Sequence, residues 1–302
     1  MDDTDRPPAP AFQDVFYSAA DGLRLHARDY GRDNRDALPV VCLAGLTRNA
    51  RDFHPLALHL SQEARTPRRV VAFDCRGRGG SQHDRDWRNY DVRVETADIL
   101  AGLTALGIER AGFIGTSRGG MIVMALAAMR PGVLAAVVLN DVGPVIDGVG
   151  LAHIRSYLQR APKPNSFAEA VAIQRAASGE AFCALDEADW ERLARALYRD
   201  ENGRPVADFD PALTKTITSL DLSQPLPTLW PQFLGLAKVP VLAIRGANST
   251  LLSAETLAAM QRHHPALETI TVEGQGHAPL LETGDLPQRI AAFFERADKH
   301  RR

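Results

Sequence analysis

Short apolar runs rich in valine alternate along this chain with segments long enough to form amphipathic helices. Continuous apolar strands of this kind are buried on both faces, as in a parallel sheet. Repetition of strand and helix favours crossover units, and therefore an α/β fold with a doubly wound, mostly parallel sheet. The apolar runs lie at residues 39–44, 69–73, 111–115, 134–140, 239–244 and 267–272, and the helical segments lie at 50–64, 93–106, 117–129, 254–263 and 286–296.

Two further segments depart from this alternation. Near the N-terminus, Asp21-Gly22 separates residues 12–18 from 23–29, and an Asp-Gly pair between alternating apolar residues indicates an antiparallel hairpin. Residues 144–231 contain helix-like pieces separated by proline, glycine or asparagine, without a β-branched strand-like run. We therefore predict a core made of residues 1–143 and 232–302, with an all-helical cap at 144–231 inserted between two strands.

The composition and net charge of the chain indicate which kinds of molecule it can bind. The chain has 35 basic and 37 acidic residues and a formal charge of −2, so no large single-sign field is available to bind nucleic acid or anionic lipid. No apolar run approaches the roughly 20 residues needed to span a bilayer, and the acidic, proline-rich N-terminus is unlike a secretory leader. The three cysteines form no CxxC pair. We expect a cytoplasmic monomer or homodimer that binds a small molecule, without metal, nucleic acid or membrane partners.

The strongest chemical signal is the G-x-S-x-G sequence at residues 115–119, centred on Ser117. An apolar strand leads into it and an amphipathic helix leads out. This context predicts a strained turn that presents the serine hydroxyl at the carboxyl edge of the sheet, with glycines relieving the crowding. The N-terminus of the helix also favours negative charge that develops nearby. Ser117 is therefore the predicted nucleophile.

A serine nucleophile needs a general base and two hydrogen-bond donors for the oxyanion. Of nine histidines, His277 alone lies in a glycine-rich loop, residues 273–279, between the last expected strand and the last expected helix. We predict that His277 is the base. The backbone amide of Arg118, the residue after the nucleophile, and that of Leu46, in the loop after the strand at 39–44, are the predicted oxyanion donors.

These features together resemble the α/β-hydrolase superfamily, specifically its capped, esterase-like members, over nearly the whole chain. The resemblance rests on four motifs in the family's order. They are the oxyanion loop Leu43-Ala44-Gly45-Leu46, the D-x-R-G-x-G-x-S loop at residues 74–81, the serine turn, and Gly276-His277. It implies a cofactor-free serine hydrolase in which the loop at 74–81 is structural.

The chain departs from the family pattern in two smaller ways. Ala44-Gly45 stands where many relatives have His-Gly, which removes one side-chain contact but keeps the backbone donor. Arg118 replaces the apolar residue that often follows the serine. Its guanidinium either packs outward or influences substrate binding, and the sequence leaves both open.

The third departure concerns the acid of the triad. Relatives usually place it just after the strand at 239–244, where this chain has the neutral Thr250, and Glu255 downstream falls within a helix. Some family members supply the acid from the adjacent strand end, where Asp141 follows residues 134–140. We predict that Asp141 is the acid. A purely structural Asp141, bonded to the turn amides, and a Ser–His dyad are the alternatives.

The substrate is less constrained by the sequence. Aromatic residues in the cap favour an apolar pocket for small or medium esters, lactones or thioesters, although Arg155, Arg160 and Arg175 could form a carboxylate-binding cluster. The same triad also serves carbon–carbon bond hydrolysis or cofactor-free perhydrolysis. A ligand-binding, receptor-like protein with a slow serine site is the alternative outside enzymes. The cap aromatics are Tyr157, Phe167, Phe182, Trp190, Tyr198, Trp230 and Phe233.

Overall fold

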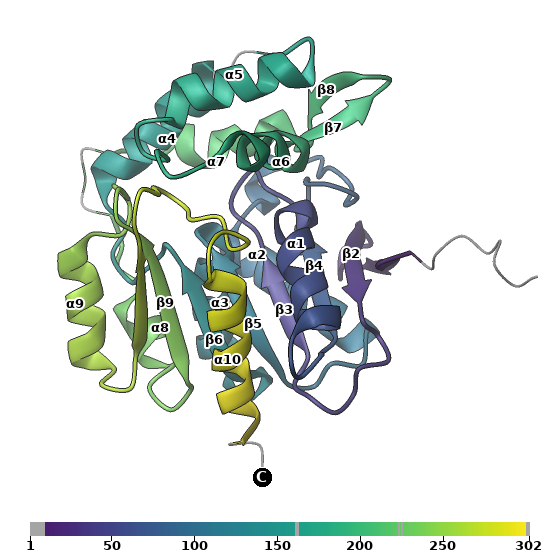
Figure 1. The fold of residues 1–302 in the computed structure, drawn as a ribbon, viewed down its shortest axis with the longest axis vertical. Helices are drawn as coiled ribbons and strands as arrows, with labels where there is room; N and C mark the ends of the chain where they lie inside the picture. Colours follow the sequence, from purple (N-terminus) through teal and green to yellow (C-terminus); the bar gives the residue numbers. More distant parts are fainter. Residues whose placement is uncertain (1–9, 161–162, 223, 225, 300–302) are drawn as a thin grey trace, which may run out of the picture.

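A computed structural model describes residues 10–160, 163–222, 224 and 226–299, and its centre is an eight-stranded sheet (Figure 1). The strand order is β1-β2-β4-β3-β5-β6-β9-β10. β2 pairs antiparallel with both β1 and β4, and all other neighbours are parallel. The predicted mostly parallel α/β sheet and its N-terminal hairpin are therefore confirmed. The strands are β1 (Gln13–Ser18), β2 (Arg24–Tyr30), β3 (Val40–Leu43), β4 (Val70–Asp74), β5 (Ala111–Thr116), β6 (Leu134–Asn140), β9 (Val241–Gly246) and β10 (Glu268–Val272).

Helices cover both faces of this sheet, because successive side chains of each buried strand point to opposite sides. In β3, Val41 and Leu43 pack in one apolar cluster with α2 and α3, whereas Val40 and Cys42 pack in another with α1 and α10. The central strands thus bury two faces at once, as their continuous apolar sequences predict. The helices outside residues 144–229 are α1 (His54–Leu58), α2 (Val92–Ala105), α3 (Arg118–Met129), α8 (Trp230–Leu234), α9 (Ala254–His263) and α10 (Leu286–Lys299).

The segment expected to form one helix at 50–64 is instead divided into three helical pieces. A 3-10 turn at Ala50–Phe53 precedes α1, and a π-helical turn at His59–Glu63 follows it. Pro55 lies in the first turn of α1. Proline has no backbone N–H, so a helix tolerates it in the first turn but not in the interior. A continuous helix over residues 50–64 therefore cannot run through Pro55.

Residues between β6 and β9 form an insert that differs from the prediction in one respect. Tyr198–Glu201 (β7) and Arg204–Ala207 (β8) pair as an antiparallel hairpin, so the expectation of an all-helical cap is wrong here. Asn202 and Gly203 both have positive φ, 57° and 84°, which is the backbone that an Asn-Gly hairpin turn requires. The helices of the insert are α4 (Gly148–Arg160), α5 (Phe167–Ser178), α6 (Glu187–Leu197) and α7 (Lys215–Thr218).

The insert lies over one end of the sheet (Figure 1). Its segment around Asp208 and Asp210 is attached to the core by polar contacts. Asp208 accepts a hydrogen bond of 2.6 Å from Arg51, and Asp210 accepts one of 2.5 Å from the Tyr90 hydroxyl. The predicted boundary at residue 231 falls inside α8, whose Phe233 is buried in the core cluster with α3.

Candidate active site

The turn between β5 and α3 presents the predicted nucleophile, Ser117. Its φ of 51° lies in the left-handed region that side chains other than glycine rarely adopt. The turn is crowded on both sides. A Cβ added at Gly119 would lie 2.0 Å from the Leu43 carbonyl oxygen, and one at Gly115 would lie 2.6 Å from the Gly120 backbone. The glycines of the motif are therefore required by the close approach of β3 and α3.

A relay of two hydrogen bonds joins three of the predicted site residues. His277 Nε2 lies 2.9 Å from Ser117 Oγ, and His277 Nδ1 lies 2.7 Å from Asp141 Oδ2. Because the carboxylate accepts at Nδ1, this geometry favours the tautomer with its proton there and leaves Nε2 free to accept from the serine.

The loop that carries His277 is held by Gln275. The Gln275 side chain donates to the Thr283 hydroxyl at 2.7 Å and accepts from the Leu280 amide at 2.8 Å. Both contacts span the loop between β10 and α10, so they fix its path around the imidazole. The glycine-rich sequence allows the turn, and the glutamine holds it in place.

Asp141 is fully buried at the end of β6, also with a positive φ, of 54°. Besides His277, its carboxylate accepts from the Gly246 amide at 2.9 Å and from the Ser249 hydroxyl at 2.5 Å. Gly246 is the last residue of β9, and Ser249 lies in the turn that follows it. Together with the bond to His277, these contacts occupy both carboxylate oxygens and fix the orientation of the Asp141 side chain.

Thr250 and Glu255 take no part in this relay. Thr250 is exposed at the turn after β9, and Glu255 is exposed in the first turn of α9. The end of β9 and the turn after it, where relatives usually carry the acid, instead supply two hydrogen-bond donors to Asp141.

The two predicted oxyanion residues flank Ser117. Arg118 is the first residue of α3, where a backbone N–H has no partner within the helix. Leu46 follows Gly45, at which an added Cβ would lie 3.8 Å from Ser117 Cβ, and Leu46 lines the same cavity as the serine. The Leu46 carbonyl accepts a hydrogen bond of 2.7 Å from Arg78 Nε, which holds this loop against the D-x-R-G-x-G-x-S loop.

The side chain of Arg118 points into a buried ion cluster rather than into the cavity. Its Nε donates to Glu95 at 2.7 Å, and the other carboxylate oxygen of Glu95 accepts from Arg78 at 2.5 Å. Burial alone would raise the pKa of Glu95, but the charges of Arg78 and Arg118 outweigh it and lower this pKa from its ordinary value. The Glu95 carboxylate thus links Arg78, which holds the Leu46 carbonyl, to Arg118, whose backbone amide is the other predicted oxyanion donor.

Ser117 opens into a cavity of about 640 Å³ between the core and α4, α5 and α6 of the insert. Of the cap aromatics, Tyr157 and Phe182 line it, whereas Trp190 and Tyr198 are buried in the insert's own apolar cluster. Phe167 packs against that cluster. Trp230 and Phe233 of α8 pack with the core.

Two of the three arginines predicted to form a carboxylate-binding cluster, Arg155 and Arg175, do not line this cavity. Arg155 donates to a backbone carbonyl at 3.4 Å, and Arg175 pairs with Glu187 at the surface. The side chain of Arg160 lies outside the described part of the structure. Other charged side chains line the cavity instead: Arg28, Arg48, Arg51, Asp52, Arg192, Arg195 and Glu282.

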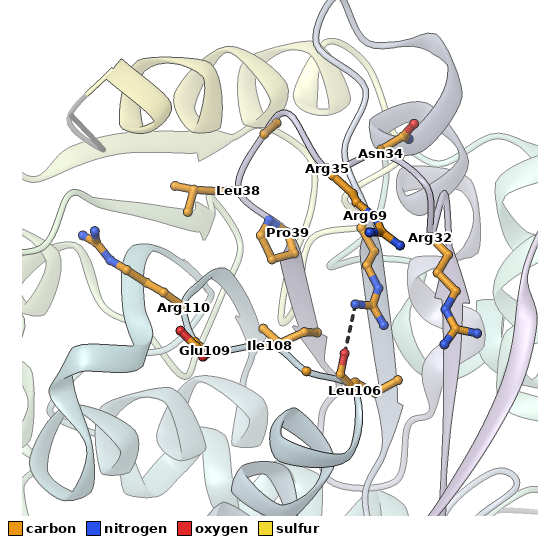
Figure 2. Close-up of a pocket in the computed structure, with 12 residues that line it drawn as sticks. Arg32, Asn34, Arg35, Leu38, Pro39, Arg69, Leu106, Ile108, Glu109 and Arg110 are labelled. Atoms are coloured by element: carbon orange, nitrogen blue, oxygen red, sulfur yellow. Dashed lines mark hydrogen bonds between the residues drawn. The ribbon is translucent and has the colours of Figure 1, made fainter.

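A second cavity, of about 680 Å³, contains none of the predicted site residues (Figure 2). It lies beside the start of β3 and the end of α2. Figure 2 shows that the guanidinium groups of Arg32 and Arg110 extend to opposite sides, while Arg69 is occupied by Asp29 and by the Leu106 carbonyl. Arg32 and Arg110 therefore do not converge on a common ligand position.

Comparison with known proteins agrees with this architecture. Residues 40–293 match the family model described as the alpha/beta hydrolase family. The chain belongs to that family. A crystal structure of an alpha/beta hydrolase from Novosphingobium aromaticivorans superimposes with a TM-score of 0.87 at 37% identity, covering 95% of this chain and 99% of that one.

Two relatives that share most of the length of this α/β hydrolase have named activities. The chain is 31% identical to a 3-hydroxybutyrate-oligomer hydrolase of Cupriavidus necator over 84% of its own length and 88% of the relative. It is 28% identical to an sn-1-specific diacylglycerol lipase of Xenopus laevis over 86% of its length and 80% of the relative. Both relatives are hydrolases, as expected for this family.

Within the described residues of this α/β hydrolase, no helix is both long and apolar enough to pass through a bilayer.

Sequence reasoning did not identify three contributors to the site. Ser249 and Gly246 hold Asp141, and Glu95 joins Arg78 to Arg118. The segment Arg245-Gly246-Ala247-Asn248-Ser249 contained the signal for Gly246 and Ser249. A serine after β9 is well placed to bond an acid at the end of β6, because the two strands are neighbours. Glu95 lies within a helix, and nothing local distinguishes it from a solvent-exposed glutamate.

Proposed function

We propose that this α/β hydrolase is a serine esterase that cleaves a carboxylic ester through an acyl-enzyme. Ser117 is the nucleophile, His277 the general base and Asp141 the acid that supports it. The observation that carries the proposal is the unbroken relay from Ser117 Oγ through His277 to Asp141, with distances of 2.9 and 2.7 Å. Hydrogen-bonded contacts of this length are those that a base needs to take a proton from a serine.

The reaction proceeds in two halves. Ser117 Oγ attacks the ester carbonyl carbon while His277 Nε2 takes its proton, and the carbonyl oxygen becomes an oxyanion held by the Leu46 and Arg118 amides. The intermediate then expels the alcohol, which receives the proton from His277. A water molecule, deprotonated by the same nitrogen, releases the acid and restores the serine.

Asp141 acts through His277. Its carboxylate fixes the imidazole in the tautomer that accepts from Ser117, and its negative charge stabilises the imidazolium formed when the serine attacks. The amide of Gly246 and the hydroxyl of Ser249 hold the carboxylate in this orientation. The acid therefore needs no contact with substrate.

Residues 144–231 act in this proposal as a cap over the core formed by 1–143 and 232–302. Helices α4, α5 and α6 contribute to the cavity that contains Ser117. A cover of this kind limits the access of water and shapes the pocket for the acyl chain.

The named activities of relatives support the ester class. An oligomer of a hydroxy acid and a diacylglycerol are both joined by ester bonds, and these are the compounds named for two relatives that share most of this chain's length. Another relative, from Escherichia coli, is named an esterase and is 26% identical over 84% of this chain.

Labelling with a fluorophosphonate, followed by mapping of the modified residue, tests this proposal. We expect modification of Ser117 alone, loss of labelling in Ser117→Ala, and steady-state turnover of short p-nitrophenyl esters. A single slow turnover without a steady state, with ligand affinity kept in Ser117→Ala, would instead identify a binding protein. Thr116→Val is a matched control, because this residue lines the same cavity beside the serine but outside the relay.

A further inference from the structure

Glu282 places an additional carboxyl group in the cavity that contains Ser117. It belongs to the loop between β10 and α10 that also carries His277. The charged groups that act on it come from two other elements, Arg48 and Asp52 near α1 and Arg192 on α6 of the insert. The carboxyl group therefore lies where the core, the insert and the histidine loop meet.

This carboxyl group has no side-chain partner. Among the described residues it forms no hydrogen bond or ion pair with another side chain, and the two nearby guanidinium groups are already occupied. Arg48 donates to both oxygens of Asp52, at 2.7 and 2.6 Å. Arg192 pairs with Asp189. Within the part of the chain that the structure describes, Glu282 is thus the one member of this group without a side-chain counterpart.

The surroundings oppose its ionisation. Burial raises the pKa of Glu282 to about 7, and the charge of Asp52 adds to the effect. A hydrogen bond from its own backbone amide and the charges of Arg192 and Arg48 only partly offset this rise. A partly buried carboxyl group whose own backbone amide is its one recorded donor among the described residues keeps acceptor positions for a ligand. In an enzyme cavity, such a group is a candidate for contact with a ligand that supplies the missing donor.

The charges around Glu282 distinguish between the donors that a ligand could bring. A substrate carboxylate would approach both Glu282 and Asp52 while Arg48 and Arg192 are already paired. An ammonium group would enter a cavity whose lining carries more guanidinium groups than carboxyl groups: Arg28, Arg48, Arg51, Arg192 and Arg195 against Asp52 and Glu282. A neutral hydroxyl group meets neither difficulty, and it donates a hydrogen bond to the carboxylate.

We propose that Glu282 binds a hydroxyl group of the substrate and that the enzyme prefers esters of hydroxy acids. The inference rests on the proposed esterase function and names the substrate class of that same site. A plain alkyl chain would fill the cavity but leave Glu282 without a partner. A hydroxylated chain of the same length gains a hydrogen bond to a charged group, which corresponds to a preference of about tenfold or more in kcat/KM.

The test compares two p-nitrophenyl esters that differ in one hydroxyl group, the butyrate and each enantiomer of the 3-hydroxybutyrate. The measured quantity is the ratio of their kcat/KM values, so the shared leaving group and triad cancel. We expect a ratio of about ten or more for one enantiomer, a fall toward one in Glu282→Leu, and an intermediate value in Glu282→Gln. The matched control is Glu255→Gln, an exposed carboxylate outside the cavity, which should keep the wild-type ratio.

The pH dependence of the same ratio provides a test without any variant. Glu282 becomes a stronger acceptor as it ionises, so the ratio should rise through about pH 7 in the wild-type enzyme and stay flat in Glu282→Gln. Steps that the two esters share affect both rates equally and cancel from the ratio. A ratio near one that does not vary with pH, in an enzyme that turns over both esters, overturns the role of Glu282 and leaves the esterase proposal intact. Absence of turnover together with absence of fluorophosphonate labelling at Ser117 overturns the esterase proposal itself.

Discussion

Asp141 Oδ2 and Ser249 Oγ are joined by a hydrogen bond of 2.5 Å, so the turn after β9 supports an acid that the end of β6 supplies. The same carboxylate oxygen contacts His277 Nδ1 at 2.7 Å. The turn where relatives usually carry the acid therefore still serves the relay, as a donor to the carboxylate rather than as its source.

Replacing Asp141, the proposed acid, should impair turnover far more than folding. Asp141→Asn keeps the size of the side chain but presents an amide to His277 Nδ1, which favours the wrong tautomer of the imidazole. We expect kcat to fall by about three to four orders of magnitude, with a circular dichroism spectrum like that of the wild type. Thr250→Ala and Glu255→Gln are the controls. Full activity in Asp141→Asn, with loss in either control, would reassign the acid.

Ser249→Ala should produce a smaller effect of a different kind. It removes one donor from a buried charged group, which costs about 1.5–3 kcal/mol of folding free energy. Urea unfolding of the variant and the wild type measures this difference. Since His277 and Gly246 still contact Asp141, we expect kcat to fall much less than in Asp141→Asn. Equal loss of kcat in the two variants would show that the serine is needed for the chemistry itself.

The relative positions of Ser117, His277 and Asp141 could be predicted because each follows a strand of one parallel sheet, whose carboxyl ends meet at a common edge. The sheet itself was predictable from continuous apolar runs. The hairpin β7–β8 was not predicted, since its strands are short and polar, although Asn202-Gly203 marks its turn. The partners of Glu95 depend on how α2 packs against two loops, which no local pattern encodes.

The cluster of Glu95 with Arg78 and Arg118 should contribute to both stability and catalysis. Glu95→Gln removes the negative charge between the buried guanidinium group of Arg78 and the partly buried one of Arg118, and breaking such a cluster costs about 3–5 kcal/mol. Because Arg78 also holds the Leu46 carbonyl, the oxyanion loop should shift and kcat should fall by up to about a hundredfold. Urea unfolding and steady-state kinetics measure the two effects. Glu109→Gln, an exposed glutamate beyond the end of α2, is the control and should change neither.

His26 on β2 should make stability depend on pH. Its ring contacts Asp74 at 2.6 Å and Asp14 at 2.9 Å. Burial opposes protonation, but the two carboxylates outweigh it and raise the pKa of His26 above its ordinary value. The protonated ring therefore stabilises the folded state fully below the unfolded pKa of about 6.5, and this contribution is lost as pH rises through the higher folded value. Urea unfolding at pH 6, 7 and 8 should show a stability advantage over His26→Gln that decreases with pH. An advantage that grows with pH would contradict the charged state assigned to this histidine.

Gly119→Ala, compared with alanine at an unhindered glycine, should show that the turn at Ser117 requires glycine at this position. The added Cβ would lie 2.0 Å from the Leu43 carbonyl oxygen and 2.9 Å from that of Ala44, both backbone atoms at the end of a central strand. These atoms cannot rotate away as a flexible side chain could, so relief requires α3 or β3 to move. Either movement displaces the Arg118 amide relative to Leu46, and a displacement of about 1 Å is enough to lower kcat about a hundredfold.

The control is Gly132→Ala, where an added Cβ meets no atom within 4 Å and φ is not positive. We expect Gly132→Ala to keep wild-type kcat, while Gly119→Ala loses activity even at temperatures where circular dichroism shows it folded. Equal kcat in the two variants would mean that the turn tolerates the side chain, and that the spacing between the two proposed oxyanion donors is not set by this contact.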